Sequence, residues 1–462
     1  MVFQQIINEK NIFQILKHAT NPDPIEVADV LEKAKELKGL SLNDVAILSN
    51  VTDNVLLEQM FDIARKIKES IYGKRLVLFA PLYISNLCVN ECTYCAFRAK
   101  NKALARRSLT RDEIAQEVNI LIQQGHKRIL LVSGESYPQE GFQYVLDSIE
   151  TIYNTKSGSG EIRRVNVNIA PLTLDEFKLL KAAKIGTYQL FQETYHFQTY
   201  NNVHLAGKKK SYNWRITALN RAMKAQIDDV GIGVLFGLYD WRFEILAVMQ
   251  HILYLENEFG VGPHTISVPR LEPATGSDIA SRPPYPVNDV DFKKIIAILR
   301  LAVPYTGIIL STRETAQTRR EAFELGVSQI SVGSRTNPGG YTEGEKVHAS
   351  QFSLNDHRPL DEVIADIAKS GYIPSFCTGC YRLGRTGRDF MSLAKPGAIK
   401  HHCDPNALST FQEYLIYYGS DKTRQAGEKA IEESLKHMDK IDRKRSEKLL
   451  EQVRAGKQDV FC

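Results

Sequence analysis

Between residues 75 and 341, short apolar runs alternate eight times with amphipathic stretches of helical length. The apolar runs have the length of strands, so the pattern predicts repeated strand–helix units around a parallel sheet. Eight such units in this length favour a closed TIM-type (β/α)8 barrel over an open sheet. The expected strands cover residues 76–85, 128–133, 164–170, 187–192, 228–236, 265–271, 306–311 and 329–334.

The chain on either side of the expected barrel is predicted to be helical. Residues 1–74 carry an apolar stripe of 3.6-residue period, and Ser41 with Asp44 forms a helix N-cap signal. Residues 342–462 form a mostly helical region that closes with one charged helix at about 421–456, whose apolar face packs on the protein. The sequence therefore predicts an α/β protein with three domains, at residues 1–74, 75–341 and 342–462.

Composition limits the kind of protein that this chain forms. It has 462 residues, of which 43% are hydrophobic and 24% charged, as in a large globular enzyme. No run is long and apolar enough for a membrane helix and the N-terminus does not resemble a secretion signal, so we expect a cytoplasmic protein. The net charge of +5, from 59 basic and 54 acidic residues, is too small and too mixed to indicate nucleic-acid binding.

Three cysteines follow the first expected strand, with the spacing Cys88-Val-Asn-Glu-Cys92-Thr-Tyr-Cys95. Three thiolates hold three irons of a 4Fe-4S cube and leave the fourth iron open, whereas electron-transfer clusters normally have a fourth cysteine. The open position predicts an exchangeable ligand on iron. The alternative is a structural zinc or a chance cluster, and against it stand the position after a strand and the lack of a nearby fourth ligand.

This loop, followed by the aromatic Phe97, resembles the radical S-adenosylmethionine (SAM) superfamily. The resemblance implies that SAM chelates the open iron, and that the stretch after the second strand meets the amino group of SAM. It also implies that an acid and a base beyond the fourth strand hold the amino-acid end of SAM, which suits charge-assisted hydrogen bonds. An ordinary surface ion pair is the alternative for those two. The implied cofactor-binding residues are Phe97, Gly134, Glu135, Ser136, Glu193 and Arg215.

The barrel region resembles, more narrowly, the lyases of this superfamily that act on tyrosine or tryptophan. The resemblance lies in residues 83–88, 267–271, 310–314 and 331–341. It implies that Arg313 clamps the substrate carboxylate, as suits a bidentate guanidinium, and that Tyr83 and Ser331 lie near the substrate amine. The alternative for the last two is that they fill layers of the barrel. A 5′-deoxyadenosyl radical from SAM then takes hydrogen from the amine and the Cα–Cβ bond breaks, which for tyrosine gives p-cresol and dehydroglycine.

A second cysteine group lies beyond the expected barrel: Cys377-Thr-Gly-Cys380 and, after twenty-two residues, Cys403. Simpler tyrosine lyases end soon after the barrel, whereas the maturases of FeFe-hydrogenase carry an extension with this spacing, and the chain resembles them over nearly its whole length. The resemblance implies a second 4Fe-4S cube with a fifth iron attached through a bridging free L-cysteine. It implies too that dehydroglycine becomes carbon monoxide and cyanide on that iron, for assembly of the hydrogenase active site, the H-cluster.

His264 stands immediately before the sixth expected strand, and therefore at the barrel end opposite to the SAM site. Imidazole is a sound iron ligand. We hypothesise that His264 binds the fifth iron, that the C-terminal domain closes this lower mouth, and that an internal channel carries dehydroglycine between the clusters. The alternatives are a core histidine and, for the three cysteines, a zinc site completed by His401 or His402.

Three functions from different classes follow from this sequence. The first is the hydrogenase maturase, the second a tyrosine lyase that stops at dehydroglycine and has a structural C-terminal metal site, and the third a non-enzymatic iron–sulfur scaffold. For the first we expect L-tyrosine as substrate, reduced ferredoxin or flavodoxin as electron donor, other hydrogenase maturation proteins as partners, and an anaerobic organism.

The seventh cysteine, Cys462, is expected to be an exposed thiol without a role.

Overall fold

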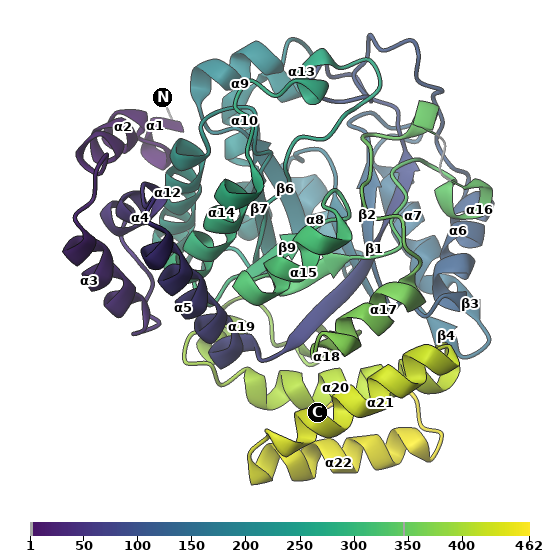
Figure 1. Cartoon of the computed structure of the whole chain (residues 1–462). Coiled ribbons are helices and arrows are strands. Elements are labelled where there is room, and N and C mark those ends of the chain that lie inside the picture. The colour runs from purple at the N-terminus through teal and green to yellow at the C-terminus, as the bar shows by residue number, and fades with distance from the viewer. Residues whose placement is uncertain (1–2, 345–346) are drawn as a thin grey trace.

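The computed structural model describes residues 3–344 and 347–462, and at its centre is a closed barrel of eight parallel strands (Figure 1). Pairing of β10 with β1 closes the sheet. The fold is the predicted TIM-type barrel. Its strands, in sheet order, are β1 (Arg75–Ser85), β2 (Arg128–Ser133), β5 (Arg164–Asn168), β6 (Tyr188–Glu193), β7 (Val230–Val234), β8 (Thr265–Ser267), β9 (Gly307–Leu310) and β10 (Gln329–Ser331).

All eight predicted strands are present, and their ends differ from the prediction by a few residues. The sixth differs most, because β8 ends at Ser267 instead of continuing to residue 271. Pro269 interrupts the ladder since proline has no N–H to donate. Pairing resumes only as a single bridge between Phe236 and Arg270.

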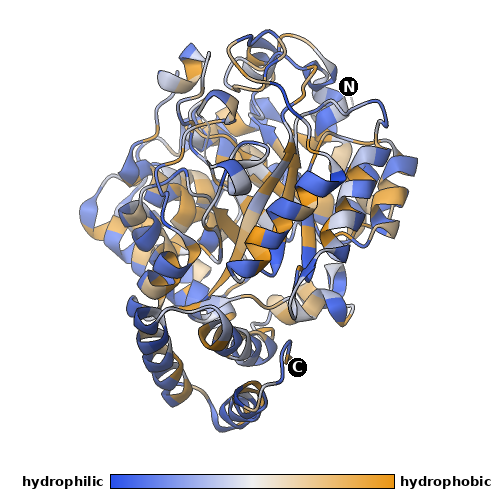
Figure 2. Ribbon diagram, turned by 90° about the vertical axis from the view of Figure 1, so that its right-hand side faces the viewer, coloured by the Kyte–Doolittle hydropathy of each residue, from blue (hydrophilic) through white to orange (hydrophobic). Residues whose placement is uncertain are grey.

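Helices cover the outside of the barrel. Figure 2 shows hydrophobic strands at the centre and hydrophilic helix faces on the outside. No helix among the described residues is both long enough and apolar enough to cross a membrane. The helices between strands are α6 (Arg111–Gln123), α7 (Gln143–Asn154), α8 (Leu174–Ala182), α9 (Phe197–Val203), α10 (Tyr212–Ile216), α11 (Ala218–Lys224), α12 (Trp241–Phe259), α13 (Asp278–Ser281), α14 (Asp289–Ala302) and α15 (Ala316–Leu325), with a small hairpin of β3 (Lys156–Ser157) and β4 (Gly160–Glu161).

Five helices precede the barrel, and the helical prediction for this part of the chain is confirmed. They lie at the left of Figure 1 and pack on α12, α14 and α15. Ser41 caps the fourth as expected, since its hydroxyl accepts the N–H of Asp44 while the Asp44 carboxylate accepts the N–H of Ser41. The five are α1 (Phe3–Ile6), α2 (Glu9–His18), α3 (Pro24–Ala34), α4 (Leu42–Ser49) and α5 (Asn54–Tyr72).

The closing helices lie below the barrel, beside the strand starts (Figure 1). Before them comes an element that the sequence analysis missed, β11 (Ile373–Ser375), which pairs in parallel with β1. The single helix expected over residues 421–456 is wrong, because the Asp439 carboxylate accepts two backbone N–H groups and begins a new helix there. The helices α16 (Gly340–Glu343) and α17 (Leu360–Lys369) precede β11, and the closing helices that follow it are α18 (Gly379–Arg382), α19 (Gly387–Ala394), α20 (Lys400–Tyr417), α21 (Asp421–Lys436) and α22 (Lys440–Arg454).

Alternate residues of each strand face the barrel interior, where they line two cavities. On β2, Arg128 at the strand start lines a lower cavity and Val132 near the strand end lines an upper one. On β10, Gln329 lines the lower cavity and Ser331 lines the upper one. The first cysteine group lines the upper cavity and the second lines the lower, so the two groups lie at opposite ends of the barrel as predicted.

Candidate active sites at the two ends of the barrel

The first cysteine group lies in the loop after β1 and lines one wall of the upper cavity. The Cys95 N–H donates to the carbonyl of Cys92 at 3.2 Å, which turns the loop back on itself. Burial raises the pKa of all three thiols, that of Cys95 to about 11. Three adjacent thiolates therefore need a bound cation to remain ionised, and cluster iron is such a cation.

Two acids and two bases form a charged quartet at the upper cavity. Arg215 donates to Glu135 at 2.9 Å and lies 3.6 Å from Glu193, while Lys209 donates to Glu193 at 2.6 Å. Burial opposes ionisation, yet Arg215 and then Lys209 hold the pKa of Glu135 below its ordinary value. Since the charges balance within the quartet, it tolerates burial and presents both signs of charge to a zwitterionic ligand.

The structure brings Glu193 and Arg215 together, as the sequence analysis predicted, and it adds Lys209, which that analysis missed. Glu193 ends β6 with φ +73, a left-handed conformation that a non-glycine residue rarely adopts and that is typical of functional sites. The sequence offered only a run of three lysines at 208–210, with no signal that the middle one is buried.

Gly134 and Phe97 pack beside the cysteine loop at the upper cavity. A Cβ atom on Gly134 would lie 2.2 Å from the Leu87 carbonyl oxygen, so glycine lets the end of β2 approach the backbone of the loop. Phe97 is 1% exposed and packs edge-on against Tyr83, with ring centroids 6.0 Å apart. Both residues line the upper cavity, whereas Ser136 is not among its lining residues.

The residues expected to bind the substrate line the same cavity from three different strand ends. The Tyr83 hydroxyl donates to Gln351 at 2.8 Å, and the Ser331 hydroxyl accepts a backbone N–H at 3.2 Å. The Arg313 guanidinium lies 3.3 Å above the ring centroid of Phe352, and among the described residues no carboxylate forms an ion pair with it. A buried guanidinium without an acid partner suits a carboxylate ligand.

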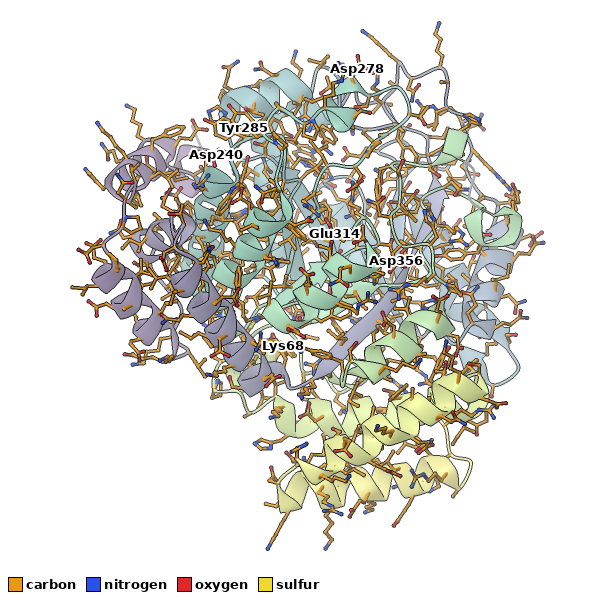
Figure 3. The ribbon with its side chains drawn as sticks, viewed as in Figure 1. Lys68, Asp240, Asp278, Tyr285, Glu314 and Asp356 are labelled. Atoms are coloured by element: carbon orange, nitrogen blue, oxygen red, sulfur yellow. The ribbon has the colours of Figure 1, made fainter. Side chains whose placement is uncertain are left out.

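Arg270 has a structural role, and it lies in the stretch 267–271 that resembles the aromatic amino-acid lyases. Its guanidinium donates to Glu314 at 3.0 Å and pairs with Asp289 at 2.9 Å. Glu314, labelled in Figure 3, directly follows Arg313, whose guanidinium in turn contacts the Arg270 carbonyl at 3.4 Å. The two stretches therefore hold each other and position Arg313 over the cavity.

The second cysteine group lines the lower cavity together with His264. Cys377 follows β11, Cys380 lies in α18, and Cys403 lies in the first turn of α20. The Gly379 N–H donates to the Cys377 sulfur at 3.3 Å. A hydrogen bond from the Cys403 thiol lowers the pKa of Cys380 and raises that of Cys403. Three sulfurs from separate elements thus converge on a cavity that also holds an imidazole.

His264 immediately precedes β8, and its ring packs against Phe390, with centroids 4.4 Å apart. Burial lowers the pKa of the imidazole, so at neutral pH the ring is uncharged and able to bind a metal. Neither His401 nor His402 lines the cavity, and Nδ1 of His401 bonds to Asp442 at 2.5 Å instead. In this arrangement neither histidine is placed as a fourth ligand in the cavity, as the zinc alternative requires.

Three arginines bring positive charge to the lower cavity: Arg75, Arg128 and Arg385. Of the basic run at residues 382–388, only Arg385 lines the cavity, because Arg382 pairs with the C-terminal tail and Arg388 donates to the end of α12. Positive charge there favours a thiolate-bound cluster or another anion.

Cys462 is not the exposed thiol that the sequence analysis expected. It is half-buried, its N–H donates to Asn406 at 2.7 Å, and its carbonyl accepts from Arg385 at 2.8 Å. The ring of the preceding residue, Phe461, lies within 4 Å of the position a Cβ on Gly379 would take. The tail therefore folds back over the second cysteine loop.

Comparisons with known proteins agree with this arrangement. The model of the radical SAM superfamily matches residues 82–249, and that of the biotin and thiamin synthesis associated domain matches residues 267–373. The 2-iminoacetate synthase of Escherichia coli (strain K12) is 32% identical over 362 residues, which cover 78% of this chain and 93% of that protein.

Two solved structures resemble the whole chain. The crystal structure of HydG, a maturase of the [FeFe]-hydrogenase, has a TM-score of 0.95 at 49% identity and covers 99% of this chain and 100% of its own. The FeFe-hydrogenase maturase HydG from Carboxydothermus hydrogenoformans has a TM-score of 0.85 at 43% identity, covering 97% and 99%. The chain belongs to the radical SAM FeFe-hydrogenase maturases. The maturase is therefore an enzyme, and the reading as a non-enzymatic scaffold is wrong.

The upper cavity of the maturase fits the cofactors that its superfamily uses, a 4Fe-4S cluster and SAM. The donor set is three thiols that need a cation, with a charged quartet beside them that suits the amino and carboxylate groups of SAM. The residues that would hold these groups are Cys88, Cys92, Cys95, Glu135, Glu193, Lys209 and Arg215.

Two further residues of the maturase were missed besides Lys209. Gln351 lies with its side-chain nitrogen 3.7 Å from the Cys95 sulfur, and nothing in the local sequence marks it. Asp229 lines the lower cavity, but the sequence analysis placed it inside a strand expected to begin at residue 228. Because β7 begins at Val230, the reasoning that singled out His264 before its strand would also have found Asp229.

Proposed function

We propose that this maturase cleaves the Cα–Cβ bond of L-tyrosine to p-cresol and dehydroglycine, and converts dehydroglycine to carbon monoxide and cyanide bound to iron for H-cluster assembly. The observation that carries the proposal is the position of two cysteine triads at opposite ends of one barrel. The similarity to 2-iminoacetate synthase supports the first reaction, since 2-iminoacetate is dehydroglycine, and the similarity to HydG supports the second.

In the upper cavity, we assign the first cysteine triad to the cluster and the charged quartet, with Phe97 and Gly134, to SAM. When bound there with the cluster, SAM would supply the 5′-deoxyadenosyl radical. Arg313 holds the substrate carboxylate through two parallel hydrogen bonds, and no carboxylate among the described residues forms an ion pair with its guanidinium. The hydroxyls of Tyr83 and Ser331 lie on the same cavity and orient the substrate amine. Ser136 loses its proposed role because it does not line the cavity.

In the lower cavity, we assign Cys377, Cys380 and Cys403 to a second 4Fe-4S cluster. The fifth iron is cargo, held by His264 and by a free L-cysteine that bridges it to the cluster. The cationic lining supports this assignment, because both the cluster and the carboxylate of dehydroglycine are negative. The barrel interior lies between the two cavities. We propose that dehydroglycine passes through it from the upper cavity to the lower one.

The remaining proposals concern partners and domains. Cleavage of SAM needs an electron, for which we propose reduced ferredoxin or flavodoxin, and the loaded iron passes to other hydrogenase maturation proteins. We propose the catalytic barrel at residues 75–341, with a helical extension at 1–74 and the second-cluster domain at 342–462. The pairing of β11 with β1 ties that last domain to the barrel.

The test is anaerobic reconstitution with iron, sulfide, L-cysteine, SAM and tyrosine, followed by infrared spectroscopy for bound carbonyl and cyanide and by spin resonance for two clusters. We expect both ligands and both cluster signals. A wild-type protein that forms p-cresol but neither carbon monoxide nor cyanide would reduce the function to a tyrosine lyase. His264→Ala is expected to keep p-cresol formation and lose the fifth iron, and unchanged iron content would remove His264 from the site.

A further inference from the structure

Asp229 occupies the lower cavity beside His264, and none of the roles assigned above uses it. The residue is 3% exposed and immediately precedes β7. Its Oδ1 accepts the backbone N–H of Gly387 at 3.0 Å and lies 3.7 Å from Nδ1 of His264. One carboxylate oxygen of this barrel residue thus contacts the C-terminal region, through Gly387, and faces the imidazole of His264.

The orientation of this carboxylate is unusual, because a buried acid normally forms an ion pair with a nearby arginine or lysine. Three arginines line the same cavity. In the part of the chain that the structure describes, however, Asp229 forms an ion pair with none of them, and the group that it faces is the uncharged imidazole of His264. Arg128 donates instead to the carbonyl of Cys377 at 2.8 Å. The carboxylate is therefore directed at the imidazole.

The two ring nitrogens of His264 have different surroundings. Nδ1 is buried and makes no hydrogen bond to any residue that the structure describes, and the Asp229 carboxylate lies just beyond hydrogen-bond distance of it, at 3.7 Å. A small rotation of the ring would bring Nδ1–H onto that oxygen. The tautomer selected in this way leaves the lone pair of Nε2 free for a metal, as in the carboxylate–histidine–metal arrangement of many metalloproteins.

Gly387 supplies its N–H to Asp229 only because it is glycine. Its φ is +51, and a Cβ there would lie 2.7 Å from Cβ of Asp228. Close behind it in the chain, Phe390 packs on the ring of His264. The loop before α19 thus fits tightly against the barrel end, and its docking and the orientation of His264 depend on the same carboxylate.

We propose that Asp229 is a positioning residue for the iron cargo: it accepts a hydrogen bond from Nδ1 of His264 and so directs Nε2 toward the fifth iron. This inference rests on the proposed role of His264. The carboxylate raises the basicity of the imidazole and holds its ring, and removal of such a partner typically lowers metal affinity about 10–100-fold. Gly387 donates to the same oxygen, so the docked C-terminal region helps to hold the carboxylate in place.

The test compares Asp229→Asn with Asp228→Asn. Asparagine at 229 keeps an oxygen for the Gly387 N–H, so the loop stays docked, but it loses the negative charge that orients the imidazole. Asp228 is the matched control, since it contacts the same loop through Thr386 at 3.3 Å but is exposed and does not line the cavity. Ferrous iron is titrated into each protein, reconstituted with both clusters and L-cysteine, and the fifth iron is followed by spin resonance and metal analysis.

We expect Asp229→Asn to need about 10–100-fold more iron for half-occupancy, and Asp228→Asn to match the wild type. His264→Ala is titrated beside them. If His264→Ala loses the iron while Asp229→Asn binds it normally, the role of Asp229 is overturned and that of His264 stands. If both bind it normally, the proposed function of His264 fails as well. Loss of the second cluster's own signal in Asp229→Asn would make Asp229 a folding residue and also overturn the inference.

Discussion

At the scale of single residues, the charged side chains of the upper cavity differ in whether the protein itself satisfies them. Glu135, Glu193, Lys209 and Arg215 neutralise one another through short contacts. Arg313 has an aromatic ring and a backbone carbonyl beside it, but within residues 3–344 and 347–462 it forms no ion pair with an acid. A satisfied group mainly shapes the site, whereas an unsatisfied buried cation favours a ligand of opposite charge. This contrast separates the proposed SAM-binding quartet from the proposed substrate clamp.

Arg313→Lys is expected to raise the KM for tyrosine about 10–100-fold, because a lysine ammonium cannot form the paired hydrogen bonds of a guanidinium and each charge-assisted bond contributes roughly 1.5–3 kcal/mol. The measurement is p-cresol formation over a range of tyrosine concentrations. Arg320→Lys is the control, since Arg320 lies in the next helix, α15, and pairs with Asp366 away from the cavity. Equal KM values for Arg313→Lys and the wild type would contradict the clamp.

Glu244 leads to a prediction on pH. Burial raises the pKa of this carboxyl, which accepts the Tyr195 N–H at 2.9 Å, from 4.5 to about 8. The folded protein therefore keeps a proton that the unfolded chain loses above 4.5. Stability from this group is complete below that pH and falls by up to about 1.4 kcal/mol per pH unit as pH rises toward 8.

Glu244→Gln carries no such proton, so its thermal unfolding midpoint is expected to fall less steeply than that of the wild type between about pH 6 and 8. Glu258→Gln, an exposed position on the same helix, should follow the wild-type slope. Parallel slopes for all three proteins would show that Glu244 is ionised in the folded state.

At the scale of elements, the junctions between strands and loops decide where the chemistry lies. The end of β2 supports the first cysteine loop through Gly134, whose N–H also donates to the Ser85 carbonyl at 2.9 Å. At the other end of the barrel, β11 pairs with the start of β1 and places Cys377 beside the strand starts. Each cysteine group is thus held by backbone contacts of β1, at opposite ends of that strand.

Gly134→Ala is expected to weaken the first cluster, because its Cβ would lie 2.2 Å from the Leu87 backbone oxygen, so the backbone of the cysteine loop would have to shift. We expect less SAM-dependent change in the first cluster's spin-resonance signal and little p-cresol, with a normal second cluster. Gly262→Ala is the matched control, since the three atoms nearest to its Cβ would all belong to the Glu256 side chain and not to backbone, the nearest at 3.1 Å. A normal first cluster in Gly134→Ala would show that the loop adapts easily.

At the scale of the whole molecule, one barrel separates two sites. The upper and lower cavities share no lining residue, and each combines residues from the barrel with residues that follow it in the chain. Gln351 reaches the first cysteine loop from beyond the barrel, and Tyr381 and Phe390 reach His264 from the C-terminal region. Because the linings are separate, damage to the lower site is expected to leave the chemistry of the upper site unchanged, whereas the lower site still depends on the product that the upper site supplies.

Cys403→Ala tests that independence. Loss of one thiolate should abolish the second cluster and with it carbon monoxide and cyanide, while SAM cleavage and p-cresol formation remain within about twofold of the wild type, since no cysteine of the first triad is touched. Cys95→Ala should abolish all four products. The readouts are p-cresol, 5′-deoxyadenosine, carbon monoxide and cyanide. Loss of p-cresol in Cys403→Ala would mean that the two sites depend on each other.

The features that could be predicted from the sequence are those encoded locally. Apolar periodicity identified all eight strands, and the rule that residues at a strand start lie at the lower end placed His264 opposite the first triad. The cap at Ser41 was found in the same way. The break at Asp439 was missed because the charged stretch on both sides of it has one continuous helical period. In the structure, the N-cap at Asp439 nevertheless ends that continuity and begins a new helix.

The sequence by itself therefore determined the barrel, the two cysteine triads and the end of the barrel at which each lies, because spacing and period are properties of neighbouring residues. Only the tertiary structure decided which ionisable groups meet. Lys209 joins the quartet, Asp229 faces His264, and Gln351 reaches Cys95 across 256 residues. Such pairs form when packing brings distant segments together, and no local pattern records which side chains then share a buried space.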